Sequence, residues 1–151
     1  MIEFTAETEI ERPAGEVFAY VTDAAKLATW QTNTVSVVVE GNGPLGLGTR
    51  LREVHRAPGG KQLASVVEVS EYETDHVSAL RMLEGKPPIH ARVTFEPTRQ
   101  GTRVRFGAHG QPTGAMRVVQ PLLSFTLKRQ FARYLATLKQ LLEQQGLNDG
   151  P

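Results

Sequence analysis

The sequence lacks cysteine altogether, carries a formal net charge of only +1 in 151 residues, and has no long apolar run. Without cysteine the chain has no disulfides, thiolate zinc sites or cysteine nucleophile, which is typical of a reducing compartment. A nearly neutral chain has no strong field to attract nucleic acid, and no segment reaches the ~20 apolar residues that a membrane span needs. The acidic, alternating start is not typical of a signal peptide. We therefore expect a cytoplasmic protein with no nucleic-acid partner and no stable membrane insertion.

Hydrophobic residues make up 40% of the chain and charged residues 22%, which is typical of a soluble globular protein. This length is ordinary for one domain with a full core. We predict a single domain over residues 1–145 and a flexible tail over residues 146–151.

The first part of the chain predicts one strand and two short helices. Apolar residues alternate with polar, mainly acidic ones over residues 2–10, so this strand has one buried face and one wet face. Next, Val17, Phe18 and Val21 fall on one face of a short helix, and a second short helix ends at Trp30, the only tryptophan.

Alternating patterns and turn residues predict six further strands, over residues 35–39, 49–56, 62–72, 76–83, 90–96 and 102–108. Their hairpin-length connections predict a mainly antiparallel sheet. Apolar residues then recur at helical spacing over residues 113–145, where Pro121 predicts either a kink or the beginning of the regular helix. Because that helix must bury a broad apolar stripe, we expect the sheet to curl around it.

Five pieces of sequence, in this order, resemble the START-like (SRPBCC) superfamily and its polyketide cyclase/dehydrase-like family along nearly the whole chain. They are Ile10-x-x-Pro13-x-x-x-Val17-Phe18-x-x-Val21-x-Asp23 followed by Leu27 and Trp30, Gly48-Thr49-Arg50, Glu68-Val69-x-Glu71-Tyr72-Glu73, Gly101-Thr102-x-Val104 and Leu135-x-x-Leu138-x-x-Leu141-Leu142-Glu143. The resemblance implies an α+β helix-grip fold, in which a seven-stranded antiparallel sheet wraps around the long C-terminal helix. It also implies two short helices between strands 1 and 2, closing one end of a cavity between sheet and helix.

The strand over residues 49–56 offers a candidate acid–base pair, Glu53 and His55. If Leu51 points inward, Glu53 and His55 do too, because side chains alternate along a strand. They would then transfer protons, or bind a hydroxyl or carbonyl group of a ligand. In the opposite register Arg50 and Arg52 would line the cavity, and a bulge would place the pair in solvent.

Other polar residues carry weaker signals. Arg81 faces inward in one register of its strand, and Leu80 and Met82 face inward in the other. The histidines never occur at the spacing of metal ligands, and the glycine-rich stretch does not match a phosphate loop, so we predict no metal and no cofactor. The basic residues of the last helix predict a solvated face, with phosphate or lipid headgroup contact as the alternative: Arg117, Lys128, Arg129 and Arg133.

We expect the protein to bind a small, largely hydrophobic molecule between sheet and helix. One alternative is a polyketide cyclase/dehydrase-type enzyme that uses Glu53 and His55, and another is a partner-binding regulatory module, including a homodimer. The residues expected to contact the ligand are Trp30, Leu51, Val67, Val93, Phe95, Phe106, Leu123, Leu127, Phe131 and Tyr134.

Overall fold

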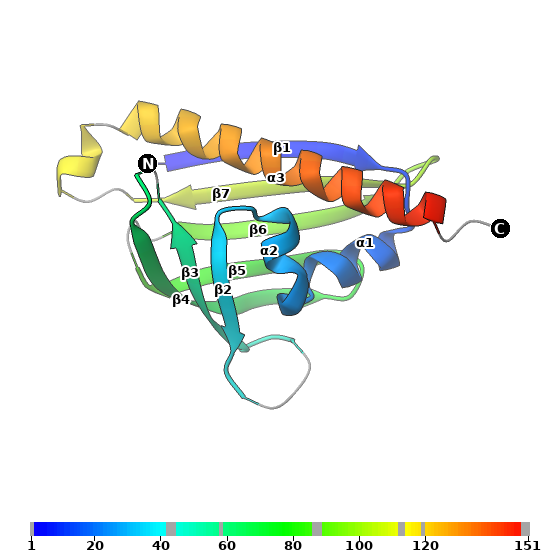
Figure 1. The fold of residues 1–151 in the computed structure, drawn as a ribbon, viewed down its shortest axis with the longest axis horizontal. Coiled ribbons are helices and arrows are strands. Elements are labelled where there is room, and N and C mark those ends of the chain that lie inside the picture. The colour runs from blue at the N-terminus through cyan, green and yellow to red at the C-terminus, as the bar shows by residue number, and fades with distance from the viewer. Residues whose placement is uncertain are drawn as a thin grey trace.

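The computed structural model of the chain describes residues 2–41, 45–57, 59–85, 89–111, 114–118 and 120–148 (Figure 1). Its elements follow the order strand, short helices, six strands and one long helix. They are β1 (Ile2–Ile10), α1 (Ala14–Val21), the 3-10 helix η1 (Ala24–Lys26), α2 (Leu27–Trp30), β2 (Thr34–Val39), β3 (Arg50–Arg56), β4 (Gln62–Glu73), β5 (Val77–Glu84), β6 (Ile89–Pro97), β7 (Thr102–Gly110), the 3-10 helix η2 (Gly114–Arg117) and α3 (Gln120–Asn148).

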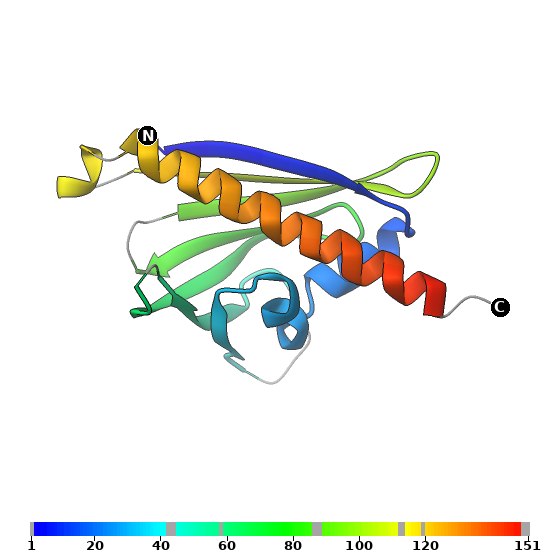
Figure 2. The ribbon, with the colours of Figure 1, turned by 45° about the horizontal axis from the view of Figure 1, so that its top comes forward.

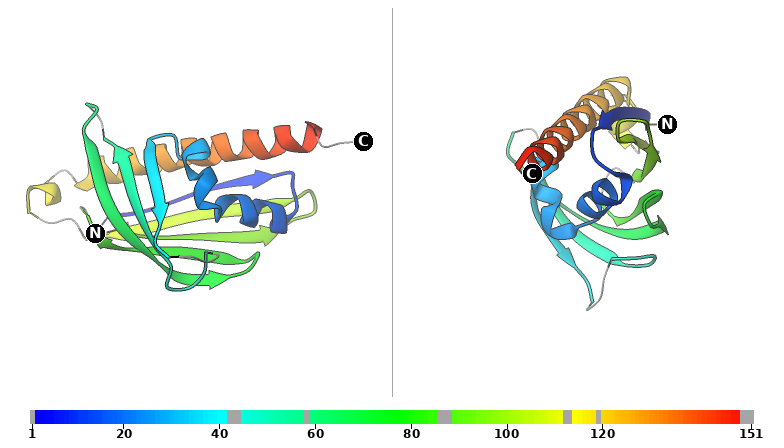
Figure 3. Two further views of the ribbon diagram at one scale, coloured as in Figure 1. Left: turned by 60° about the horizontal axis from the view of Figure 1, so that its bottom comes forward. Right: turned by 90° about the vertical axis from the view of Figure 1, so that its right-hand side faces the viewer.

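All seven strands form one antiparallel sheet in the order β1-β7-β6-β5-β4-β3-β2. The sheet curls, and α3 lies along its inner side, as the views in Figures 2 and 3 show. The predicted α+β helix-grip fold is therefore confirmed, including its seven strands and the short helices between β1 and β2.

Helix α3 begins at one of the two places that the sequence left open, and it ends beyond the predicted position. Pro121 is its second residue, so it lies in the first turn, where a backbone donor has no intrahelical acceptor. Of the two predicted roles of Pro121, the beginning of the regular helix is correct, and the short helix η2 precedes it. At its other end α3 runs on to Asn148, beyond residue 145. No helix in the described ranges is long and apolar enough to cross a membrane.

The short helices fill one end of the space between the sheet and α3. Helix α1 packs on β6, where the ring of Phe18 meets Phe95 edge-on with the ring centroids 5.2 Å apart. Helix α2 packs on α3, where Trp30 stands edge-on to Tyr134 at 6.4 Å and is only 1% exposed. Burial of these rings anchors both helices, because large aromatic side chains contribute much of the apolar area of a core.

Candidate functional site

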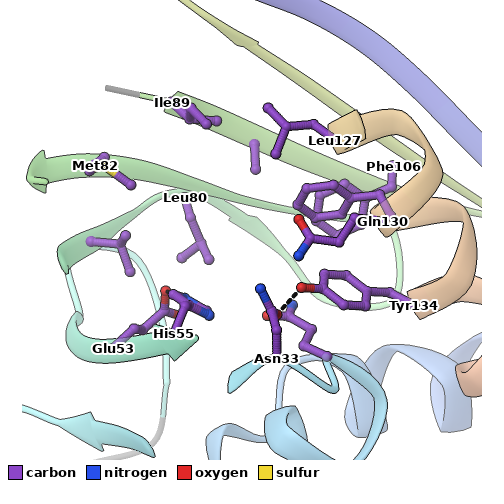
Figure 4. Close-up of a pocket in the computed structure, with 14 residues that line it drawn as sticks. Asn33, Glu53, His55, Leu80, Met82, Ile89, Phe106, Leu127, Gln130 and Tyr134 are labelled. Atoms are coloured by element: carbon purple, nitrogen blue, oxygen red, sulfur yellow. Dashed lines mark hydrogen bonds and ion pairs between the residues drawn. The ribbon is translucent and has the colours of Figure 1, made fainter. Parts of the chain in front are cut away.

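A cavity of about 220 Å³ lies between the sheet and α3 (Figure 4). Strands β3 to β7 supply one wall, α3 supplies the other, and the turn after α2 closes the lower side. Most of the lining residues are apolar: Val67, Leu80, Met82, Ile89, Ala91, Phe106, Leu127 and Phe131. The six polar ones are Gln31, Asn33, Glu53, His55, Gln130 and Tyr134.

Strand β3 has the register in which Leu51 and Glu53 point inward. Both are buried, at 1% and 7% exposure. Arg50 and Arg52 point outward, where their Nε atoms form ion pairs with Glu68 at 3.4 Å and with Glu40 at 2.7 Å. Those carboxylates come from β4 and from the residue after β2, so each outward arginine has a partner elsewhere in the sheet. The alternative with both arginines in the cavity is therefore wrong.

Glu53 and His55 lie two residues apart on the same face of β3 and contact each other. His55 Nε2 is 3.1 Å from Glu53 Oε2, and His55 Nδ1 is 3.2 Å from Thr34 Oγ1 on the neighbouring strand. A neutral imidazole satisfies both contacts when Nε2–H donates to the carboxylate and Nδ1 accepts from the hydroxyl. Thr34 thus orients the ring, and the pair offers a carboxylate next to an imidazole inside a mostly apolar cavity.

Across the cavity, the Tyr134 hydroxyl donates a hydrogen bond to the side-chain oxygen of Asn33. Burial raises the pKa of Tyr134 well above its ordinary value; a hydrogen bond with Gln130 opposes this shift and the charge of Glu53 adds to it. Tyr134 therefore keeps its proton at neutral pH and serves as a hydrogen-bond donor. Figure 4 shows Asn33 between His55 on the β3 side of the cavity and Tyr134 on the α3 side.

The structure brings only part of the predicted ligand-contacting set into this cavity. Five members line it: Val67, Phe106, Leu127, Phe131 and Tyr134. Trp30 and Val93 line a smaller adjoining cavity of about 40 Å³. Leu123 lines an open groove on the other side, whereas Leu51 and Phe95 are core residues that line none of these spaces.

Several lining residues were missed, although the sequence carried a signal for some of them. Gln130 precedes Tyr134 by one helical turn, so the spacing that identified Tyr134 also indicates Gln130. Leu80 and Met82 follow from the register in which Arg81 points outward, which is the observed one, since Arg81 forms an ion pair of 2.6 Å with Glu68. Ala91 shares its strand face with Val93 and Phe95, so alternation indicates it as well. The remaining three had no such signal: Gln31, Asn33 and Ile89.

The groove beside the cavity has a volume of about 560 Å³ and lies between the first half of α3 and the junction of β3 and β4. It shares four lining residues with the cavity: Asn33, His55, Leu127 and Gln130. The two spaces are therefore direct neighbours.

Solved structures of low sequence identity share this fold. Protein TTHA0849 from Thermus thermophilus is 22% identical, with a TM-score of 0.78 over 91% of this chain and 94% of that one. Protein SA2116 from Staphylococcus aureus, described as a protein of unknown function, is 12% identical, with a TM-score of 0.74 over 97% and 96%. Protein NE0264 from Nitrosomonas europaea is 18% identical, with a TM-score of 0.73 over 97% of each chain.

No curated protein matches the chain significantly. The model of one family, described as polyketide cyclase / dehydrase and lipid transport, matches residues 1–143. That match covers all seven strands and most of α3, and it agrees with the START-like resemblance of the sequence. The chain therefore belongs to the polyketide cyclase / dehydrase and lipid transport family, whose fold is suited to binding hydrophobic ligands.

Proposed function

We propose that the protein binds one small, largely apolar molecule in the cavity between the sheet and α3, and that it orients a carbonyl or hydroxyl group of this molecule. The observation that carries the proposal is the distribution of side chains around the cavity (Figure 4). Apolar residues from β4 to β7 and α3 form most of the wall, and the polar residues gather near Glu53, His55 and Tyr134.

The two kinds of wall have different roles in binding. Apolar contact supplies most of the affinity, at about 25 cal/mol for each Å² of apolar surface removed from water. The polar group of the ligand then has partners of both kinds: the side-chain amide of Gln130 offers donors, and the carboxylate of Glu53 offers an acceptor. A buried polar group without a partner is costly, so these residues select ligands with a matching group at that end.

Filling part of the cavity should weaken this binding. Ala91 of β6 lines the cavity, so Ala91→Leu places a larger side chain in the ligand's space. We expect the affinity for N-phenyl-1-naphthylamine, a neutral fluorescent probe, to fall by about tenfold, equivalent to about 1.4 kcal/mol. Trp30, the only tryptophan, lies next to the cavity, and energy transfer from it to the probe measures binding.

The matched control is Ala132→Leu, which adds the same side chain on the exposed face of α3 and should leave the affinity unchanged. Thermal unfolding of both variants checks that they are folded at the temperature of the titration. The proposal is contradicted if the wild-type protein does not bind the probe, or if Ala91→Leu binds it as tightly as Ala132→Leu.

A second candidate function is proton transfer on a bound ketone, and the contact of 3.1 Å between Glu53 and His55 favours it. In this reaction Glu53 removes a proton from the carbon next to the carbonyl group, while the side-chain amide of Gln130 donates a hydrogen bond to the developing enolate oxygen. His55 stabilises the carboxylate and, by its contact with Thr34, keeps its own orientation.

Deuterium exchange tests this second candidate. Benzylacetone in deuterated water should lose its α-proton NMR signals faster with the wild-type protein than without it. Glu53→Gln should lower that acceleration by about 100-fold, because general-base catalysis contributes about 10²–10⁴ in rate. Glu96→Gln, an exposed carboxylate on β6, is the control. Exchange that is equally fast with Glu53→Gln assigns the acceleration to another group and rejects this role for Glu53.

A further inference from the structure

Three arginines from two elements line the groove beside the cavity. Arg129 and Arg133 are one turn apart on α3, and Arg56 is the last residue of β3. Since residues four apart on a helix are neighbours on its surface, the two helical guanidinium groups stand on one side of the groove and Arg56 stands on the other. Among the described residues that line the groove, none is acidic.

These arginines differ from those on the outer face of β3. Arg50 and Arg52 each form an ion pair with a glutamate. In the part of the chain that the structure describes, no ion pair is formed by Arg56, Arg129 or Arg133. Among the described residues, no carboxylate therefore pairs with their positive charge, which is concentrated beside the cavity.

The groove also exposes apolar surface that a purely polar ligand would not cover. Leu63 of β4 is 44% exposed, and Leu122 and Phe125 of α3 are 66% and 59% exposed. The guanidinium of Arg129 lies over the ring of Phe125, 5.8 Å from its centroid. Apolar surface bordered by cations favours a molecule that has an apolar body and a negative group.

We infer that the groove binds the anionic group, a carboxylate or a phosphate, of an amphiphile whose apolar part occupies the cavity. The four shared lining residues place the groove directly beside the cavity, within reach of one ligand. Guanidinium groups bind carboxylate and phosphate oxygens through paired hydrogen bonds, which suits three arginines around one anion. This inference rests on the proposed function and adds the charge class of the ligand to it.

Competition between two compounds that differ in the head group tests the inference. Decanoate and decanol have tails of the same length, and each displaces N-phenyl-1-naphthylamine if it enters the cavity. The wild-type protein should bind decanoate about tenfold more tightly than decanol, because hydrogen bonds to charged groups are the stronger ones. This preference should shrink as sodium chloride is added, since the arginines are exposed.

Substitutions separate the arginines from the cavity. The double variant Arg56→Gln with Arg133→Gln should lose the preference for decanoate while its affinity for decanol stays within about twofold of wild type. Arg99→Gln, an exposed arginine in the β6–β7 turn at the opposite end of the sheet, removes the same type of charge and should keep the preference.

The outcomes distinguish this inference from the proposed function. If decanol and decanoate bind equally well, or if the double variant keeps the preference, the inference is overturned and the apolar cavity stands. If the neutral probe does not bind at all, both are overturned.

Phosphatidylcholine vesicles with and without phosphatidylglycerol then identify the source of the anion. Sedimentation only with phosphatidylglycerol, lost in the double variant, indicates a bilayer lipid; no sedimentation alongside a decanoate preference indicates a free amphiphile.

Discussion

Phe131→Ala is expected to lower the free energy of unfolding by about 3 kcal/mol and, at the same time, to enlarge the cavity. The Phe131 ring lies between α3 and the sheet, with ring centroids 4.6 Å from Phe106 and 5.1 Å from both Phe4 and Tyr134. Its removal breaks three aromatic contacts and leaves a space that the surrounding side chains fill only in part. Because Phe131 also lines the cavity, that space adds to the ligand's volume.

Urea unfolding and probe titration together measure both effects. Phe125→Ala removes the same ring from the same helix at a position that is 59% exposed, and its stability should stay within about 0.5 kcal/mol of wild type. The ratio of the affinity for N-phenyl-1-naphthylamine to the affinity for the smaller naphthalene should be higher in Phe131→Ala than in the wild-type protein. An equal loss of stability in the two variants would mean that Phe131 does not join the helix to the sheet.

The fold could be predicted because its signals are local and periodic. Alternation along two neighbouring strands placed Val93, Phe95, Val104 and Phe106 on one face, and all four are buried in the main core. Alternation assigns a residue to a face of the sheet. It does not show how far along the strand the cavity lies, so Phe95 was expected to contact ligand but packs against α1 instead.

The candidate site was less predictable, because its geometry depends on contacts between residues that are far apart in the sequence. Both faces of β3 carry polar residues, so the sequence of the strand alone left two registers open. In the structure Leu51 and Glu53 are buried, and the outward arginines meet Glu40 and Glu68, which lie on other segments of the sheet. Asn33 lies in a turn, where no periodic pattern indicates that it accepts a hydrogen bond from Tyr134 about a hundred residues later.

The β6–β7 turn contains a glycine whose importance is apparent only from the packing of the turn in the structure. Gly101 stands in one of the pieces that resemble the START-like superfamily, and by its sequence it is an ordinary turn glycine. In the structure this turn packs against the chain that leaves β1. The hydroxyl of the fully buried Thr102 donates a hydrogen bond of 2.8 Å to the backbone oxygen of Arg12. The turn therefore fixes the segment that leads directly into α1.

Gly101→Ala is accordingly expected to lower the free energy of unfolding by about 3 kcal/mol, at the upper end of the cost of overpacking. A Cβ atom at residue 101 would overlap the carbonyl oxygen of Ile10 and would lie 2.8 Å from Glu11 Cα and 2.9 Å from Arg12 N. These are backbone atoms, so no side-chain rotation relieves the overlap. Either the turn or the segment before α1 must move.

Gly46→Ala is the matched control for this prediction, since nothing lies within 4 Å of a Cβ atom at that position. Its stability, measured by urea unfolding, should stay within about 0.5 kcal/mol of wild type or rise slightly, because alanine restricts the unfolded chain. A loss of less than about 1 kcal/mol in Gly101→Ala would show that the turn relaxes freely. In that case the buried rings of Phe18 and Trp30, and not the contact between the turn and β1, hold the short helices at the closed end of the cavity.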